Sequence, residues 1–505
     1  MLDRILSLPF IVILMGIGAA AMYVPAAHAA AIGDGAVMRA FLLSGTIFLI
    51  LTSMIGIATA NQQIRSQARS HLLALVGTFT LLPLMLAVPI VEAVRDTTYL
   101  NAWFEMVSSL TTTGATLFQT DRLPPSVHLW RALVGWMGGF FVWVTAVAIL
   151  APMNLGGYEV LSPHEVGRGP MQSADEIWAS DSRLRLQRYA ARLFPIYFAL
   201  TVTLWIGLLI AGSTPLAAFC HAMSTLATSG ITPLDGLQSA GAGIAGEVLI
   251  CFFLVFALSR TSFSVDQPGS GLRRLTRDPE FSMGLALIFA VPALLFLRHW
   301  VGAYEVDEVG DIPAASQALW GSIFTVMSFL TTTGFVSSSW TEAQSWSGLA
   351  TPGLVLMGLA LVGGGVATTA GGVKLLRIYA LYKLGAREMN KLVHPNSVGG
   401  SGGTARRLRR QGAYVAWISF MLFGISIAVI TLALSAFGLS FEAATTVAVA
   451  ALSTTGPVLS VVGETPITYA ALHDGAKVIA AIAMVIGRLE TLALIALLNP
   501  EFWRS

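Results

Sequence analysis

One short pattern recurs four times in this chain, at residues 110–114, 226–230, 330–334 and 452–456. Each copy has Leu four positions before a glycine, Thr two positions before it, and Thr or Ser one position before it. The intervals between the copies are long and similar, and self-similarity of this kind is the signature of repeated structural units. The pattern therefore predicts four copies of one large unit, each of which presents one such segment.

Apolar sequence dominates the chain and indicates its surroundings. The chain has 505 residues, of which 55% are hydrophobic and 11% charged, with a mean hydropathy of +0.73. Soluble proteins carry about 25% charged residues, and runs of about 20 apolar residues are long enough to cross a bilayer. We therefore expect a multi-pass membrane protein in a lipid bilayer. The formal net charge of +2, spread over many loops, gives no indication of nucleic-acid binding.

Hydropathy predicts ten membrane spans. The first begins near residue 8, and the others lie at about 38–60, 72–94, 129–152, 190–211, 244–262, 282–300, 348–385, 412–437 and 472–498. The first 30 residues allow two interpretations, because Arg4, an apolar run and the small residues 27–30 imitate a signal peptide. The alternative, which we adopt, is a retained first helix with Pro25 near its outer end.

Basic residues alternate between the loops of the chain. The segments that follow the even-numbered spans are rich in Arg, as at 183–192 and 406–410, whereas the segments that carry the glycine pattern hold several acids, such as Asp121 and Asp235. Cytoplasmic loops of membrane proteins are enriched in Lys and Arg. This asymmetry predicts that both termini lie in the cytoplasm and that all four glycine segments lie toward the outside.

Each glycine follows a polar segment that is too short to cross the membrane, such as 101–110 or 441–452. We interpret each segment as a half-helix that enters from outside, and Thr214–Pro215 is a suitable start for the second one. The C-terminal end of each half-helix carries partial negative charge and points toward the pore centre, which favours the binding of a cation. Irregular backbone at membrane depth is tolerated where it lines a cavity.

The loops that follow the half-helices predict an ion filter, because inward-facing carbonyls can replace the hydration shell of a cation. The predicted filter residues are Thr112, Thr113, Gly114, Thr228, Ser229, Gly230, Thr332, Thr333, Gly334, Thr454, Thr455 and Gly456. Small residues also promote close helix packing in membranes. A single copy of the pattern would fit that alternative, but four copies on one side of the membrane favour the filter.

Several motifs resemble those of the TrkH/KtrB/HKT superfamily of potassium transporters, above all its bacterial TrkH/TrkG branch. They lie at 104–116 (first pore loop), 219–221 (second pore loop), 363–374 (glycine-rich segment of the third unit), and 487–490 with 502–504 (C-terminal signature). The fourth loop has Gly456–Pro457, as that branch does, although Ser453–Thr455 resembles the other three loops more than the usual fourth loop.

The resemblance implies an all-α polytopic fold of four helix–pore loop–helix (M1-P-M2) repeats around one pore, with an N-terminal two-helix hairpin. The corresponding divisions of this chain are 1–66 for the hairpin and 67–160, 161–280, 281–410 and 411–505 for the four pore repeats.

The same resemblance implies a function. It identifies the chain as the ion-conducting subunit of a Trk-type potassium uptake system in the bacterial inner membrane, with potassium as the transported ion. Gly114 at the first filter position implies potassium rather than sodium, and a sodium-permeable HKT-like or a Ktr-type cation transporter is the alternative. The implied partners are a second copy of the chain and a cytoplasmic TrkA-like nucleotide-binding ring, which the basic loops at 168–192 and 406–410 face. Channel conduction and symport with H⁺ or Na⁺ both remain open.

The second helix of the third unit carries a glycine cluster between 363 and 372. Glycine costs about 1 kcal/mol in a helix interior, so we expect this helix to be broken near mid-membrane. The resemblance implies that the break is a gating loop, formed by Gly363, Gly364, Gly365, Ala367, Thr368, Thr369, Gly371, Gly372 and Lys374. A glycine face for close helix packing is the alternative.

Arg488 lies inside the last span, where a charge is costly and marks a pathway or a partner. It is placed to donate to the carbonyls of the gating loop, or to pair with Glu490. Lys477, nearer the outer end of the same span, is expected to extend toward the interface.

Glu105, His221 and Glu442 lie in the half-helices, where we expect capping, packing or electrostatic roles. The sequence has no nucleophile motif, metal-ligand set or phosphate loop, and the chain is not predicted to be an enzyme.

Overall fold

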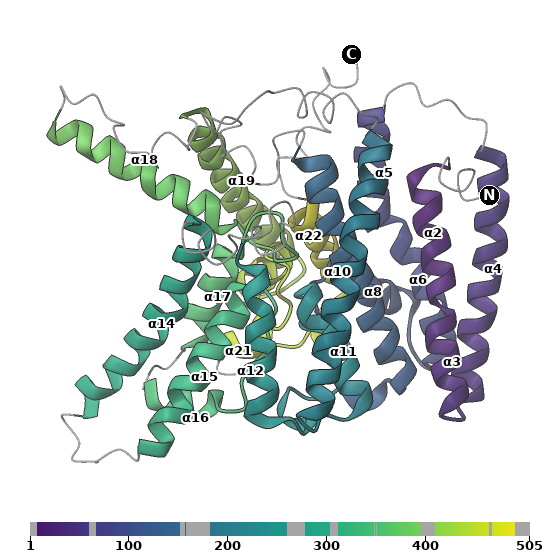
Figure 1. The fold of residues 1–505 in the computed structure, drawn as a ribbon, viewed down its shortest axis with the longest axis horizontal. Helices are drawn as coiled ribbons and strands as arrows, with labels where there is room; N and C mark the ends of the chain where they lie inside the picture. Colours follow the sequence, from purple (N-terminus) through teal and green to yellow (C-terminus); the bar gives the residue numbers. More distant parts are fainter. Residues whose placement is uncertain are drawn as a thin grey trace.

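The structure of the protein is a computed structural model. It describes residues 8–59, 67–151, 157, 182–259, 278–303, 312–347, 349, 351–394, 410–463 and 467–489. Within these ranges every regular element is a helix. The predicted all-α class is therefore confirmed, and Figure 1 shows the helices arranged around a centre where several short segments meet.

The helices follow the order that the repeats predict. The N-terminal hairpin comprises α2 (Phe10–Ala21), α3 (Tyr23–Ala31) and α4 (Gly35–Thr59). The first repeat comprises α5 (Gln67–Thr80), α6 (Leu82–Ala93), α7 (Tyr99–Leu110) and α8 (Pro125–Thr145), and α8 is extended by a π-helical turn at Ala146–Leu150. The second comprises α10 (Ser182–Ile210), α11 (Pro215–Ala227) and α12 (Gly243–Leu254).

The last two repeats are built in the same way, with additional short helices. The third repeat comprises α14 (Pro279–Ala303), α15 (Ile312–Leu330), α16 (Trp340–Ser347), α17 (Gly353–Val362) and α18 (Leu375–Val393). The fourth comprises α19 (Arg410–Ser435), α20 (Phe441–Leu452), α21 (Val458–Val462) and α22 (Asp474–Leu489). In each repeat the pore helix (α7, α11, α15 or α20) lies between a preceding and a following helical segment, as expected.

Seven helices in the described part of the chain are long and apolar enough to cross a membrane. They run over Phe10–Ala31, Gly35–Thr59, Leu73–Ala93, Pro125–Leu150, Arg185–Ile210, Pro279–Leu297 and Gly412–Ser435. The other three of the ten expected spans correspond to α12 and α17, which are shorter, and to α22, which the structure describes as far as Leu489. α12 tightens into a 3₁₀ turn at Val255–Ala257, and α17 stops at Gly363.

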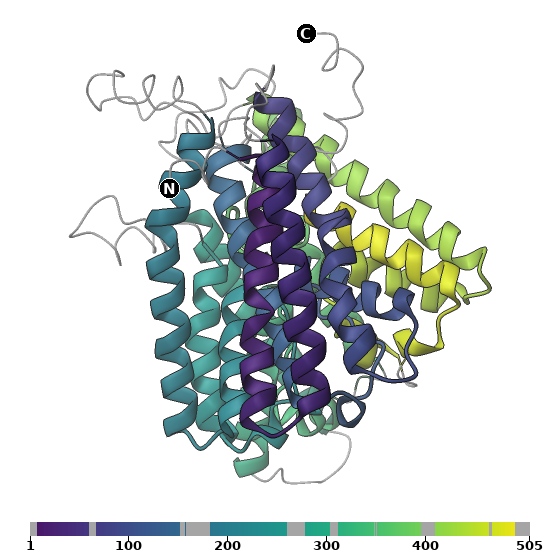
Figure 2. The same cartoon turned by 90° about the vertical axis from the view of Figure 1, so that its right-hand side faces the viewer.

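The N-terminal hairpin packs against the first repeat. The ring of Phe10 stacks on Phe141 of α8 with centroids 5.7 Å apart, and His28 Nδ1 lies 2.8 Å from Ser126 Oγ. Figure 2 shows α2 and α4 as two adjacent upright helices on this side of the molecule. The first apolar run thus packs as a helix of membrane-spanning length against the first repeat.

The four repeats pack in cyclic order. In each repeat, the membrane helix that comes after the pore loop contacts the pore helix of the next repeat. Thus α8 packs on α11, α12 on α15, α17 on α20, and α22 on α7. The last of these contacts joins the fourth repeat to the first and closes the ring. This arrangement brings together the loops that follow the C-terminal ends of all four pore helices.

The pore helices begin with different caps. The side chains of Thr98 and Ser440 accept hydrogen bonds from the backbone N–H groups of Asn101 and Ala443, and they cap α7 and α20. α11 begins at Pro215 as predicted, but the hydroxyl of Thr214 makes no capping bond. Pro215 has no N–H group and already fixes the first turn. Thr214 therefore stands at the N-cap position that the sequence predicted, without a hydrogen bond from its side chain.

Candidate ion pathway

The four pore helices end with the same backbone turn. The N–H group of the residue one before each glycine reaches back five residues, from Thr113 to Ser108 O (2.8 Å), and the equivalent bonds in the other loops measure 2.8–2.9 Å. The residue two before each glycine bonds three residues back, as from Thr112 to Ser109 O. This is the Schellman pattern that closes many helices. The sequence repeat therefore encodes one local structure four times.

A threonine occupies the left-handed position of this turn in every loop. The φ angles are +54° at Thr112, +50° at Thr228, +57° at Thr332 and +53° at Thr454. Helices usually end with glycine at this position, because a side chain there costs about 1–2 kcal/mol. Four β-branched residues in the same strained conformation indicate that the side chain has a role that glycine could not fill.

The glycines lie where neighbouring loops touch. A Cβ atom on Gly114 would lie 2.0 Å from Ser229 O in the second loop, and one on Gly230 would lie 2.1 Å from Thr333 O in the third. A Cβ atom on Gly334 would lie 2.9 Å from the ring of Pro457 in the fourth loop. A Cβ atom on Gly456 would lie 2.3 Å from Ala115 N in the first loop. The contacts run from loop to loop and return to the start, so the four loops form a closed ring.

The fourth loop departs from the other three in one respect. Gly114, Gly230 and Gly334 have φ between +65° and +82°, whereas Gly456 does not have a positive φ. Gly456 precedes Pro457, and a residue before proline is restricted to extended backbone. Its N–H group donates to Thr113 O at 2.6 Å, and its carbonyl accepts from Tyr469 at 3.2 Å. The fourth loop is thus bonded directly to the first.

The ring leaves polar oxygens without protein donors. Thr112, Thr228, Thr332 and Thr454 are at most 1% exposed, and their carbonyl oxygens accept no hydrogen bond from any residue that the structure describes. The hydroxyls of Thr112 and Thr454 are also buried without a partner among these residues. Buried carbonyls are almost always satisfied. A partly dehydrated cation satisfies carbonyl and hydroxyl oxygens together, so the chemistry of this ring fits a cation.

The predicted break in the third repeat is confirmed. α17 ends at Gly363 and α18 begins at Leu375, and the segment between them is irregular. Gly363, Ala367, Gly372 and Lys374 in this segment have positive φ. The segment 363–374, here called the intramembrane loop, therefore cannot continue either helix.

Side chains from several helices hold the intramembrane loop against the filter. Arg488 of α22 donates from Nη2 to Thr369 O at 2.6 Å. The hydroxyl of Thr332 in the third filter loop accepts from the N–H group of Gly371 at 2.7 Å. The hydroxyl of Thr228 in the second filter loop donates to Thr369 Oγ1 at 3.2 Å. The loop therefore lies directly beside the left-handed threonines of the ring.

The other predicted residues of the loop make bonds within it or to nearby helices. The Thr368 hydroxyl donates to Gly365 O, and the Lys374 ammonium donates to Ala370 O. The N–H group of Leu375 donates to Gly364 O. These bonds give the loop a defined shape.

Two further contacts hold the opposite end of the loop. The N–H group of Val366 donates to Glu280 Oε1 of α14 at 3.0 Å, and that of Gly365 donates to Ala257 O at 2.9 Å. Glu280 is buried and was not predicted from the sequence. A charged residue at the start of an apolar span was the available signal, because such residues usually mark a functional contact.

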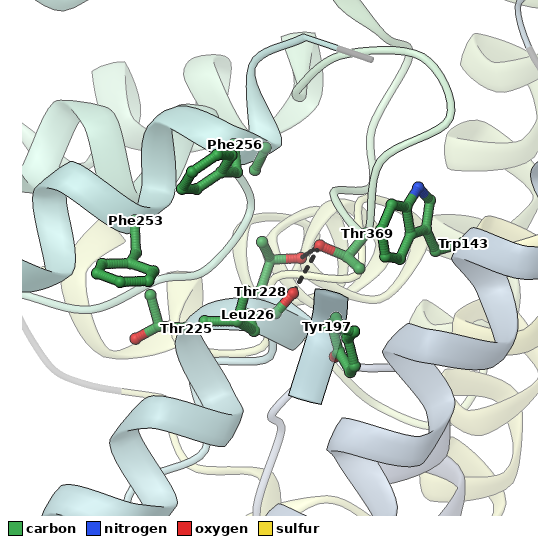
Figure 3. A pocket seen from close by; sticks show the side chains of 9 residues that line it. Trp143, Tyr197, Thr225, Leu226, Thr228, Phe253, Phe256 and Thr369 are labelled. Carbon is green, nitrogen blue, oxygen red and sulfur yellow. Dashed lines mark hydrogen bonds between the residues drawn. The ribbon is translucent and has the colours of Figure 1, made fainter. Parts of the chain in front are cut away.

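A small pocket adjoins the intramembrane loop (Figure 3). Four aromatic residues, Trp143, Tyr197, Phe253 and Phe256, line it together with Thr369 and other residues. The hydroxyl of Thr369 donates to Leu226 O at 3.2 Å, which joins the loop to the end of the second pore helix. The pocket therefore leaves open space beside the residue that carries the contact with Arg488.

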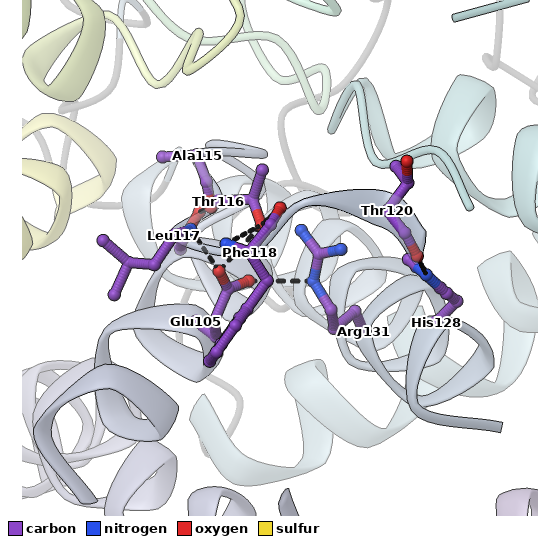
Figure 4. A network of polar contacts seen from close by, with 9 residues as sticks. Glu105, Ala115, Thr116, Leu117, Phe118, Thr120, His128 and Arg131 are labelled. Carbon is purple, nitrogen blue, oxygen red and sulfur yellow. Dashed lines mark hydrogen bonds and ion pairs between the residues drawn. The ribbon is translucent and has the colours of Figure 1, made fainter. Parts of the chain in front are cut away.

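The polar residues of the pore helices hold the segments that follow the filter. Glu105 Oε1 accepts from the Thr116 hydroxyl at 2.8 Å and from the Leu117 N–H group at 2.6 Å, and its Oε2 forms an ion pair with Arg131 Nε at 2.8 Å (Figure 4). His221 Nε2 lies 2.9 Å from the Thr232 hydroxyl. Both residues thus have the structural and electrostatic contacts that were expected of them.

Lys477 does not extend toward the interface as predicted. It is buried, and its ammonium donates to Asn101 Oδ1 at 3.1 Å and pairs with Asp474 at 3.0 Å. The interpretation was wrong because α22 packs directly on the start of α7, where a polar partner is within reach. The alternative partner of Arg488, Glu490, lies outside the described residues, as do residues 168 and 502–504 and the basic positions 406–409.

Comparison with known proteins shows likeness over nearly the whole chain. The family model TrkH, described as a cation transport protein, matches residues 37–265 and 282–504. The chain is 30% identical over 487 residues to the Trk system potassium uptake protein TrkH of Escherichia coli strain K12, and the match covers 96% of each chain. TrkG of the same strain is 27% identical over 481 residues and 92% of each chain. The crystal structure of the potassium transporter TrkH from Vibrio parahaemolyticus covers 100% of both chains, with a TM-score of 0.80 and 26% identity.

Proposed function

This chain belongs to the TrkH family of cation transport proteins, and we propose that it is the ion-conducting membrane subunit of a Trk-type potassium uptake system. Relatives named for potassium uptake match it from end to end, and its apolar helices make it a multi-pass membrane protein. Potassium is accordingly the transported substrate. The sodium-permeable alternative is not favoured, since these relatives carry the name of the potassium system.

The observation that carries this proposal is the ring of four left-handed threonines with free carbonyls. Potassium would be bound by the carbonyl oxygens of the twelve predicted filter residues, and the hydroxyls of Thr112 and Thr454 would supply further ligands. The C-terminal ends of four pore helices point their partial negative charge at the same place. The protein thus replaces water around the ion without placing a full negative charge in its path.

The intramembrane loop would act as the gate below this filter. It lies beside Thr228 and Thr332 of the ring, and Arg488 holds the carbonyl of Thr369. Displacement of the loop, with release of the Arg488 contact, would open the path. The loop and the fixed charge together would keep the pathway closed until a partner moves them.

The proposal includes partners and an orientation. The protein would work in the bacterial inner membrane as a homodimer, with both termini in the cytoplasm. A TrkA-like nucleotide-binding ring would dock on the cytoplasmic face, where Arg188 and Arg192 of α10 add to the basic loops. Both H⁺- or Na⁺-coupled transport and channel conduction are compatible with the filter.

Growth and ⁸⁶Rb⁺ or K⁺ uptake in a potassium-uptake-deficient bacterium test the proposed function. Expression of the chain together with a TrkA-type ring should restore growth at low external K⁺, and external Na⁺ in excess should not compete. A chain that reaches the membrane but restores no uptake would contradict the proposal. Uptake of Na⁺ in preference to K⁺ would support the sodium-permeable alternative.

A further inference from the structure

In three of the four repeats, a polar side chain of the pore helix forms a hydrogen bond with the segment that follows the glycine. The residue nine positions before each glycine stands on the pore helix, and it differs in every repeat. These residues are Glu105, His221, Thr325 and Val447. The four loops have the same backbone conformation at the turn, so the residue at this position shows how the contacts between loop and pore helix differ from repeat to repeat.

The first loop is held by a charged network. Glu105 is 1% exposed and accepts from both Thr116 and Leu117, the second and third residues after Gly114. Arg131 of α8, itself 4% exposed, compensates the carboxylate charge. Charge-assisted hydrogen bonds are stronger than neutral ones. The outer part of the first loop is therefore fixed firmly to its own pore helix.

The third loop is held by a second buried carboxylate, which comes from a different repeat. Glu247 of α12 is 2% exposed, and its Oε2 accepts from the Trp320 indole at 2.9 Å and from the Ser337 hydroxyl at 2.7 Å. Its Oε1 accepts from the N–H group of Ser338 at 2.6 Å. The Thr325 hydroxyl adds a bond from the N–H group of Ser337. No described basic residue forms an ion pair with Glu247.

The second and fourth loops lack a carboxylate in this place. His221 makes a single bond to the Thr232 hydroxyl at 2.9 Å. Val447 offers no polar atom, and the fourth loop is held instead by the Tyr469 hydroxyl on Gly456 O at 3.2 Å. Because the loops contact each other in the order first, second, third and fourth, the two loops with carboxylates face each other across the ring.

We infer that Glu105 and Glu247 are positioning residues that hold two opposite walls of the filter apart and thereby determine the preference for K⁺ over Na⁺. This inference rests on the proposed potassium filter. A smaller ion requires the coordinating oxygens to move inward, and a ring with two fixed walls resists that movement. Neither carboxylate touches the ion. Each acts through the backbone of the segment after the glycine.

Replacement of Glu247 by Gln isolates this role. Both carboxylate oxygens of Glu247 accept from N–H donors, those of Trp320 and Ser338. A carboxamide has one oxygen and one NH₂ group, so one of these donors must face another donor. The side chain keeps its size, and no buried cation loses its partner. Glu105→Gln is less suitable, because it would leave Arg131 buried without its counter-ion, which is strongly destabilising.

The test compares K⁺ and Na⁺ flux through purified protein in vesicles. We expect Glu247→Gln to lower the K⁺/Na⁺ flux ratio about tenfold, which corresponds to the loss of one hydrogen bond to a charged group. Glu442→Gln is the matched control, because Glu442 is an exposed carboxylate on the fourth pore helix. Its ratio should stay within about twofold of wild type. A folded Glu247→Gln protein with an unchanged ratio would overturn the inference.

Ser337→Ala provides a second variant in case Glu247→Gln does not fold. It removes one bond to the carboxylate, together with the acceptor of the Ser339 N–H group at 3.2 Å, and the K⁺/Na⁺ ratio should fall about threefold, in line with a single hydrogen bond. An unchanged ratio in Ser337→Ala would also contradict the inference. If wild-type protein itself shows no preference for K⁺, the proposed function fails. If wild type prefers K⁺ and the variants keep its K⁺/Na⁺ ratio, the proposed function stands and only the role of the carboxylates is refuted.

Discussion

The filter ring and the intramembrane loop lie side by side, but they are held in opposite ways. Each filter loop continues its own pore helix through bonds that span five residues or fewer, as from Thr113 to Ser108. The intramembrane loop is held by partners far away in the sequence, including Arg488, Thr332 and Glu280. The turn of each filter loop is closed locally and recurs four times, with distant bonds such as that of Gly456 to Thr113 added to it, whereas the intramembrane loop is held once by distant parts.

Under the proposed function, this difference explains how one pore would both select and open. Local bonds make each filter loop as stable as the helix that carries it, so its oxygens keep their positions. Distant bonds make the intramembrane loop dependent on the placement of whole helices, so a small shift of α14 or α22 can release it. Low-stability elements are those that move in gating. The comparison predicts that substitutions in the two regions affect different measured quantities.

Arg488→Ala should have the largest effect on the gate. It removes a charged hydrogen bond to Thr369, and such bonds contribute about 1.5–3 kcal/mol, so ion flux without the regulatory partner should rise about tenfold to a hundredfold. The measurement is ⁸⁶Rb⁺ flux into vesicles that contain the purified chain alone. Lys477→Met on the same helix is the control, because its ammonium bonds Asn101 rather than the loop. Unchanged or lower flux in folded Arg488→Ala protein would mean that Arg488 is structural.

Gly114→Ser should change selectivity. A Cβ atom would lie 2.0 Å from Ser229 O, and φ of +72° is unfavourable for serine, so the first and second loops must separate. Sodium permeation should rise, and the K⁺/Na⁺ ratio should fall about tenfold, a shift of about 1.4 kcal/mol. The inhibition of ⁸⁶Rb⁺ uptake by added Na⁺ measures this change in selectivity. A ratio equal to that of wild type would count against selection by the carbonyl ring.

Thr369→Val should have the smallest effect. The hydroxyl of Thr369 donates to Leu226 O and accepts from Thr228, and valine has nearly the same shape without these bonds. Loss of neutral hydrogen bonds of about 1 kcal/mol should raise flux without the partner about fivefold. The same vesicle flux assay detects it. If Thr369→Val opened the path as widely as Arg488→Ala, the side-chain bonds rather than the charge would be the main restraint.

Sequence predicted what is local and repeated. The ends of the pore helices at Leu110, Leu330 and Leu452, the shared turn and the break after Gly363 could all be read from residues close together in the chain. The carbonyls of the intramembrane loop were one of two partners that the sequence predicted for Arg488, and the structure has that contact. These features depend on short-range backbone preferences or on a recognisable motif.

Contacts between repeats could not be predicted in the same way. Glu247 of the second repeat holds the third loop, and Glu280 of α14 holds the intramembrane loop. Nothing in the spacing of these residues indicates their partners, because the contacts depend on which helix packs on which. Lys477 was misjudged for the same reason. The difference between Gly456 and the other three glycines, which have positive φ, agrees with the restriction that the following Pro457 places on its backbone.

The central claim is that selection and gating are separate properties of the two regions, and the K⁺/Na⁺ flux ratio of Arg488→Ala tests it most directly. The ratio should be measured in vesicles beside wild type and Gly114→Ser, with the total flux recorded at the same time. The account predicts higher flux in Arg488→Ala with a ratio within about twofold of wild type, because the filter bonds are local. A ratio that falls as far as that of Gly114→Ser would show that the loop shapes the filter, and it would contradict the account.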